Sequence, residues 1–150
     1  MNAQHGTDDW QPVVDVPGPL SPAELAVLYR DASVMLVNPV RDGLNLTAKE
    51  FVACQSASPG ALALSPHAGV FDELGPWSVS VDPKCPIQMS AAVHKALMMP
   101  EEERTACIRK MDNSLRANPL NLWVDTFTEL LGAPDSEAEF VKSYRQIASG

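Results

Sequence analysis

The sequence predicts an α/β protein built on a partial, doubly wound parallel sheet with a helical C-terminus. Two short and wholly apolar segments, residues 34–37 and 61–64, predict parallel strands covered by helices on both faces, because such strands lack polar alternation. Each is followed by a turn and a helix-forming segment, which is typical of doubly wound sheets. A third short strand is expected at residues 78–81, ended by Asp82-Pro83. A complete Rossmann sheet has about six strands, so this one should be partial.

Composition and charge narrow the class of protein. The chain has 150 residues, of which 45% are apolar and 20% charged, as in an ordinary globular domain. Its net charge of −8, without a run of Lys or Arg, makes nucleic acid and acidic membrane unexpected partners. The three cysteines, Cys54, Cys85 and Cys107, are scattered and lack the spacing of a metal site. With no signal peptide and no long apolar run, the cytoplasm is the expected location.

Three regions are expected along the chain. Residues 1–19 are polar and end in Val-Pro-Gly-Pro, which predicts a flexible or extended leader. Within it, Trp10 and residues 13–14 are compatible with a short strand or a docking segment. Residues 20–132 should form the folded domain. Residues 133–150 are predicted to be a C-terminal helix or tail, either exposed or docked on a partner.

Two helices are predicted by capping residues and apolar spacing. Ser21, Pro22 and Glu24 combine a serine cap, a proline in the first turn and a capping box. The residues that follow on one expected buried face are Leu25, Leu28 and Tyr29. Near the end of the domain a second stripe of period 3.6 predicts core packing, and it comprises Leu122, Trp123, Phe127, Leu130 and Leu131.

The segment between the first strand and its helix has the features of an anion site. Asn38-Pro39 ends the strand, Gly43 lets the backbone approach a ligand closely, and Asn45 is suited to cap a helix that starts at Leu46. The first helical N–H groups have no internal partner, and the helix dipole adds about half a positive charge there. In an open parallel sheet, this turn lies at the edge where ligands bind.

Two carboxylates flank this turn and allow two interpretations. Asp42 lies in the turn, and Glu50 lies a little over one helical turn into the helix. In one interpretation Asp42 accepts hydrogen bonds from a hydroxyl-rich ligand, and Glu50 takes a second diol such as a ribose. In the other, Asp42 only forms the turn and Glu50 is a solvated helix residue.

The segment Arg41-Asp42-Gly43-Leu44-Asn45-Leu46-Thr47-Ala48-Lys49-Glu50-Phe51 closely resembles the signature of the trehalose-6-phosphate synthase family. These are retaining glycosyltransferases of the GT-B fold, grouped in glycosyltransferase family 20. Flanking residues resemble the family in the same order: Leu20-Ser21, Glu24-Leu25, Leu28-Tyr29-Arg30, Ala32-Ser33-Val34, Glu50-Phe51-Val52-Ala53-Cys54, Gly60 to Ser65, Ala68-Gly69, Glu73-Leu74 and Trp123. The resemblance covers roughly Pro19 to Gly132, and therefore implies the carboxyl-terminal part of the donor-binding domain.

The resemblance implies roles for individual residues. Asp42 would bind a sugar hydroxyl and Glu50 the ribose of a nucleotide sugar. The backbone N–H groups that would hold sugar and phosphate oxygens belong to Gly43, Leu44, Asn45, Leu46 and Thr47. Leu20 would lie beside the nucleotide base, or alternatively pack on Leu25 as a hydrophobic staple. Further residues that could line the pocket are Arg41, Lys49 and His67, although a loop histidine is commonly just solvated.

The implied reaction moves glucose from a nucleotide sugar, expected to be UDP-glucose, to a sugar phosphate with retention. The departing phosphate helps to deprotonate the acceptor, so no metal, no cofactor and no covalent protein nucleophile is expected. In the family, the acceptor pocket and the basic side chains that clamp the diphosphate precede this region. We therefore expect this chain to be incomplete and inactive alone, with a complementing N-terminal domain or a homo-oligomer as possible partner. The alternatives are a transferase using glycerol phosphate or a cyclitol phosphate, and a non-catalytic sugar-nucleotide binding or interaction remnant.

Overall fold

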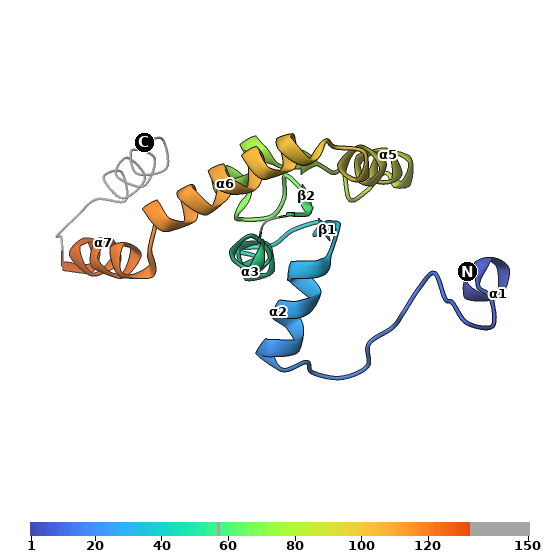
Figure 1. The fold of residues 1–150 in the computed structure, drawn as a ribbon. Helices are drawn as coiled ribbons and strands as arrows, with labels where there is room; N and C mark the ends of the chain where they lie inside the picture. Colours follow the sequence, from blue (N-terminus) through green and yellow to red (C-terminus); the bar gives the residue numbers. More distant parts are fainter. Residues whose placement is uncertain (57, 133–150) are drawn as a thin grey trace.

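The computed structural model describes residues 1–56 and 58–132. Helices and strands alternate through the first part of the chain, and helices follow (Figure 1). In order, the elements are α1 (Asn2–His5), α2 (Pro22–Asp31), β1 (Val34–Val37), α3 (Leu46–Cys54), β2 (Ala61–Leu64), α4 (Phe71–Leu74), the 3₁₀ turn η1 (Gly75–Trp77), β3 (Val79–Ser80), α5 (Pro86–Leu97), α6 (Glu101–Ala117) and α7 (Leu120–Gly132). The predicted α/β class with a helical C-terminal part is confirmed.

The three strands form one parallel sheet in the order β1-β2-β3. Val34 lies opposite Ala61 and Val37 opposite Leu64, so the first two strands pair along their whole length. The third strand is shorter than predicted, because only Val79–Ser80 pair as a strand with β2. The ladder nevertheless continues one residue further, since the N–H of Val81 donates to the carbonyl of Leu64 at 3.0 Å.

Helices cover both faces of the sheet, as a doubly wound fold requires. Leu62 and Leu64 belong to a core cluster with Phe51 of α3 and Met111 of α6. The alternate residues of β2 belong to a second cluster, built with the small side chains of α5: Ala61, Ala63, Ala92 and Ala96. Helices α3 and α6 therefore cover one face of the sheet, and α5 covers the other. Strand β2 is buried throughout and is the centre of the domain.

Strand β1 departs from the prediction that it is covered on both faces. Its Leu36 side chain is 36% exposed, and only Val37 of the strand is fully buried. The physical reason is position, because β1 is the edge strand of the three while β2 is central. An apolar run of four residues indicated a buried strand in both cases, and it could not distinguish centre from edge.

Helix α2 has the predicted start but a narrower buried face. The hydroxyl of Ser21 accepts from the N–H of Glu24, and the N–H of Ser21 donates to the Glu24 carboxylate at 2.9 Å, which completes the capping box. Tyr29 is buried and Leu25 packs against the core, but Leu28 is 50% exposed. The prediction that all three share one buried face is therefore wrong for Leu28.

The predicted core packing of α7 is also wrong. Trp123 is 56% and Phe127 41% exposed, and Leu131 is 72% exposed. The two rings stack on each other with centroids 5.2 Å apart. Asn118-Pro119 separates α6 from α7, and α7 lies beyond the sheet in Figure 1. The apolar stripe is real, but its side chains are not part of either core cluster of the described chain.

The leader contains a short helix and no strand. Helix α1 spans Asn2–His5, and the Asn2 side chain bonds both backbone groups of Val13. Trp10 is 58% exposed. The boundaries at residues 19/20 and 132/133 stay predictions, and the predicted C-terminal helix at 133–150 lies outside the described residues.

Candidate functional site

Two loops meet at the carboxyl edge of the sheet, where the anion site was predicted. One follows β1 and the other follows β2. The Ser65 hydroxyl donates to the carbonyl of Pro39 at 2.8 Å, and the N–H of Asp42 donates to the carbonyl of His67 at 3.1 Å. A Cβ added to Gly69 would lie 2.1 Å from the carbonyl oxygen of Gly43, so glycine is needed there for close packing. The second loop therefore holds the first in place.

Asn45 organises the turn before α3. It is the only non-glycine residue with positive φ (66°) among those described, a conformation that asparagine tolerates. Its side-chain oxygen accepts from the N–H of Ala48 at 3.0 Å and thereby caps the helix, as predicted. Its amide nitrogen donates to the Asp42 carboxylate at 2.6 Å, and the other Asp42 oxygen accepts from the N–H of Leu44 at 3.3 Å. Asp42 therefore fixes the turn, and its contact with a ligand stays a prediction.

The first turn of α3 offers backbone donors to the surface. Among the described residues, the N–H groups of Leu46 and Thr47 donate no hydrogen bond. Gly43 is exposed, and no atom lies within 4 Å of where its Cβ would be. Leu44 and Leu46 beside it are 54% and 57% exposed. The arrangement combines free N–H groups, the positive end of a helix dipole and apolar surface, which suits a ligand with both anionic and apolar parts.

Glu50 is held by a tyrosine that sequence reasoning did not connect to it. The Tyr29 hydroxyl, from α2, donates to one oxygen of the exposed Glu50 carboxylate at 3.2 Å. Tyr29 itself is only 8% exposed. Burial raises the pKa of the Tyr29 phenol, and the nearby Glu50 charge raises it further. The sequence placed Tyr29 on a buried helix face, but nothing in the spacing of residues 29 and 50 indicated their contact.

Lys49 is committed to an ion pair within the protein. Its ammonium lies 2.5 Å from a carboxylate oxygen of Glu73, which joins α3 to α4. The other Glu73 oxygen is buried and has no hydrogen-bond partner among the described residues. Arg41, by contrast, is exposed and forms no ion pair within the part of the chain that the structure describes. Of the two basic residues predicted near the pocket, Arg41 is the one free to meet an anion.

The remaining predicted residues lie at the margin of the site. The side chain of His67 is exposed, although its carbonyl is part of the contact between the two loops. Leu20 is partly exposed and precedes the cap of α2, while Leu25 packs on the core. The staple and the base-binding role of Leu20 both stay predictions.

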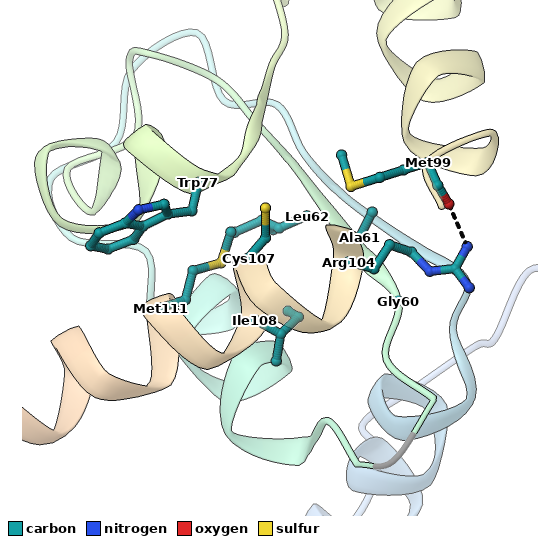
Figure 2. A pocket seen from close by; sticks show the side chains of 9 residues that line it. All are labelled: Gly60, Ala61, Leu62, Trp77, Met99, Arg104, Cys107, Ile108 and Met111. Carbon is teal, nitrogen blue, oxygen red and sulfur yellow. Dashed lines mark hydrogen bonds between the residues drawn. The ribbon is translucent and has the colours of Figure 1, made fainter. Parts of the chain in front are cut away.

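Two cavities of the described chain are lined by none of the predicted site residues. One is enclosed between the start of β2 and α6; its lining includes Leu62, Cys107 and Met111, and the Arg104 side chain donates to the carbonyl of Met99 at 3.0 Å (Figure 2). It is too narrow for a water molecule. The other is an open hollow on α5, lined by Pro86, Ile87, Ser90, Ala91 and His94. Within residues 1–56 and 58–132, no group of His, Cys, Asp and Glu side chains is arranged to hold a metal ion.

Comparison with known proteins identifies the family. The sequence model of glycosyltransferase family 20 matches residues 1–133. The chain belongs to glycosyltransferase family 20. It is 39% identical over 125 residues to the probable alpha,alpha-trehalose-phosphate synthase [UDP-forming] 2 of Arabidopsis thaliana, a match that covers 82% of this chain and 15% of that relative. It is 35% identical to the trehalose-6-phosphate synthase of Sodalis glossinidius, over 94% of this chain and 30% of the relative.

Solved structures of this family share the fold. A synthase from Burkholderia xenovorans, in complex with glucose-6-phosphate, superposes with a TM-score of 0.83 at 38% identity, covering 88% of this chain and 29% of that one. A structure from E. coli bound with UDP-2-fluoro glucose gives a TM-score of 0.83 at 34% identity, covering 89% and 30%. The chain therefore has the architecture of part of a GT-B glycosyltransferase, and it spans less than a third of the length of these relatives. None of the helices described here is both long and apolar enough to cross a membrane.

Proposed function

We propose that this chain is the carboxyl-terminal part of the donor-binding domain of a trehalose-6-phosphate synthase-type transferase. The observation that carries the proposal is the construction of the β1–α3 turn. Asn45 caps α3 from a left-handed conformation, Asp42 fixes the turn, and the N–H groups of Leu46 and Thr47 stay free at the carboxyl edge of the sheet. The family match and the fold support the same conclusion.

The proposed ligand is a nucleotide sugar, with UDP-glucose as the first candidate. The free N–H groups at the start of α3 would hold phosphate and sugar oxygens, and the helix dipole would stabilise their charge. Asp42 would accept from a sugar hydroxyl, and the exposed Glu50 carboxylate from the ribose hydroxyls. Arg41 is exposed and could approach the diphosphate. Support for this ligand comes from the relative bound with UDP-2-fluoro glucose.

The proposed reaction transfers glucose to a sugar phosphate with retention of anomeric configuration. Negative charge develops on the leaving diphosphate and must be stabilised by fixed donors. Lys49 is engaged with Glu73, so among the proposed pocket residues Arg41 is the one basic side chain left for this task. We therefore propose that the remaining cations and the acceptor pocket come from another part of the enzyme, either a complementing domain or a second copy. The free thiols among the described residues, Cys54, Cys85 and Cys107, accord with the cytoplasmic location that we propose.

Two alternatives are kept because the acceptor is not chosen by these residues. A transferase using glycerol phosphate or a cyclitol phosphate would have the same donor turn. A non-catalytic module that binds a sugar nucleotide would also keep it, while lacking any acceptor. Glucose-6-phosphate is the first acceptor to test, because the relative from Burkholderia xenovorans was solved with it.

The first test is a two-dimensional amide NMR titration of the full chain with UDP. Binding is expected to shift the amides of residues 43–50 while those of α7 stay in place. Well-dispersed peaks that ignore UDP would contradict donor binding by this chain. In a second assay, the purified chain mixed with UDP-glucose and glucose-6-phosphate is expected to release no UDP. Trehalose phosphate formed by the chain alone would overturn the proposal that another part is needed.

A further inference from the structure

The contact between α2 and Glu50 points to a role for a residue outside the signature segment. We propose that Tyr29 is a positioning residue, which holds the Glu50 carboxylate ready to receive the ribose hydroxyls of the nucleotide. This inference rests on the proposed function, because it assigns Glu50 to the ribose. It goes further in adding a residue, 21 positions earlier in the chain, on which the nucleotide affinity should depend.

The geometry leaves one side of the carboxylate available. The Tyr29 hydroxyl donates to Oε2 of Glu50 at 3.2 Å. The Oε1 atom accepts no hydrogen bond from the described residues, and the Glu50 side chain is exposed to solvent. A carboxylate with one oxygen tied to the protein and the other free can still accept from a diol at its open side. Tyr29 therefore orients the Glu50 carboxylate and leaves its Oε1 atom available to a ligand.

Tyr29 is itself held rigidly enough to do this. Its ring lies in the same core cluster as Phe51 and Val52 of α3. Its carbonyl accepts from the side-chain amide of Gln55 at 2.6 Å, and the Gln55 oxygen accepts from the N–H of Gly60 at 2.7 Å. Backbone and ring are thus fixed to α3 and to the start of β2, so the hydroxyl has little freedom to leave Glu50.

A held carboxylate binds a diol better than a mobile one. A free glutamate side chain loses rotamer freedom when a ligand orders it, and that cost is subtracted from the affinity. The hydrogen bond from Tyr29 already restricts the Glu50 side chain in the folded protein, so less rotamer freedom is lost when the ligand binds. The phenol is a suitable donor because a tyrosine hydroxyl is protonated at neutral pH, and burial and the Glu50 charge raise the pKa of Tyr29 further. Its aromatic ring supplies the core packing that a smaller donor such as serine would lack.

The competing explanation is that this hydrogen bond only joins α2 to α3. A purely structural bond would affect every ligand of the site alike. A positioning bond affects only the interaction made by Glu50, and only with ligands that carry ribose hydroxyls. These two cases are separated by combining protein variants with a nucleotide that lacks those hydroxyls.

The experiment measures binding of UDP and of dideoxy-UDP, which lacks both ribose hydroxyls, by calorimetry with the full chain. The variants are Tyr29→Phe, Glu50→Gln and the double substitution. Tyr29→Phe is expected to weaken UDP binding by about fivefold, the cost of ordering one long side chain. It should leave dideoxy-UDP binding unchanged, and it should add nothing in the Glu50→Gln background.

A matched control removes another hydrogen bond of α2, one that involves neither Tyr29 nor Glu50. Glu24→Ala breaks the capping box at the start of the same helix and does not touch Glu50. It is expected to lower the melting temperature with no change in UDP affinity. Melting curves and amide spectra of every variant show whether each one is folded.

The outcomes separate this inference from the function on which it rests. If the wild type binds UDP better than dideoxy-UDP but Tyr29→Phe behaves like the wild type, the positioning role is wrong and the proposed function stands. If Tyr29→Phe weakens both nucleotides equally, or acts fully in the Glu50→Gln background, its role is structural. A wild type that does not bind UDP at all would overturn both.

Discussion

Helices α3 and α7 have similar apolar content but opposite surroundings. In α3, the side chains of Ala48, Phe51 and Val52 are buried against the sheet, and the polar residues Thr47 and Glu50 share the remaining surface. In α7, the apolar stripe of Trp123, Phe127 and Leu131 is exposed instead. Both amphipathic segments thus form helices, but only the apolar side of α3 is covered by the sheet.

This difference indicates which residues stabilise the described fold and position the proposed site. The proposed ligand edge includes the N-terminus of α3, which is fixed by a cap, an ion pair and the neighbouring loop. A rigid scaffold of this kind reduces the cost of ordering a binding site. The α7 stripe contributes little to the described core, so substitutions there should matter much less. Four predictions test this contrast between buried and exposed positions, from the largest expected effect to the smallest.

Truncating matched phenylalanines should give the largest contrast. Phe51 is 0% exposed and Phe127 is 41% exposed. Phe51→Ala should cost about 3–5 kcal/mol of unfolding free energy, because it leaves a cavity in the core. Phe127→Ala should cost about 1 kcal/mol or less, mainly the stacking on Trp123. Urea denaturation of the full chain measures both, and equal losses would show that α7 is as deeply packed as α3.

Removing one carboxylate from each helix should weaken nucleotide binding only for α3. Glu50→Ala is expected to weaken UDP binding by about 1.5–3 kcal/mol, the value of charge-assisted hydrogen bonds to hydroxyls. Glu129 of α7 is exposed, and Glu129→Ala should leave UDP binding unchanged. Calorimetric titration gives both dissociation constants. An unaltered constant for Glu50→Ala would remove Glu50 from the site.

Breaking a partly buried ion pair should cost more stability than breaking an exposed one. Lys49→Ala leaves the Glu73 carboxylate, already with one unpartnered buried oxygen, without its counterion. The expected loss is about 1–3 kcal/mol of unfolding free energy. Arg116→Ala breaks the exposed pair with Asp112 on α6, where a much smaller loss is expected because solvent screens the two charges. A larger effect of Arg116→Ala in thermal unfolding would contradict this ranking.

The capping box of α2 should give the smallest effect and a pH dependence. Hydrogen bonds from Ser21 lower the pKa of Glu24 below its ordinary value of 4.5. Because the pKa is lower in the folded state, the stabilisation is present above pH 4.5 and is lost as the pH falls through the folded value. The difference in melting temperature between wild type and Ser21→Ala should therefore be larger at neutral pH than in acid, where only the bond from the Glu24 N–H to the Ser21 hydroxyl is still lost. A constant difference across this range would show that the Glu24 charge plays no part.

Much of the site could be predicted from local sequence because its parts are close along the chain. Asn45 as a helix cap, the strand before it and the helix after it all follow from short-range rules of turn and cap chemistry. The capping box at Ser21 was predictable for the same reason. The family assignment also came from a continuous segment, residues 41–51, and the comparisons confirm it.

Contacts between distant segments could not be predicted in this way. Tyr29 reaches Glu50 and Lys49 reaches Glu73 only after the helices pack on the sheet. Ser65 is fully buried, and its hydroxyl is satisfied there by the hydrogen bond that joins the two loops at the sheet edge. None of these pairs has a spacing that a helix or a turn would impose.

The sequence by itself determined the local elements of this protein: its strands, its caps and the glycine turn that marks the family. The tertiary structure decided which of those elements are covered. Val34–Val37 and Ala61–Leu64 are equally apolar, yet one is an edge strand and the other the centre of the sheet. Hydrophobic spacing predicts which side chains of a helix or strand share one face and can be buried together, because it follows the repeat of that single element. What buries them depends on neighbours that are distant in sequence, and within the described part of the chain the α7 stripe stays exposed.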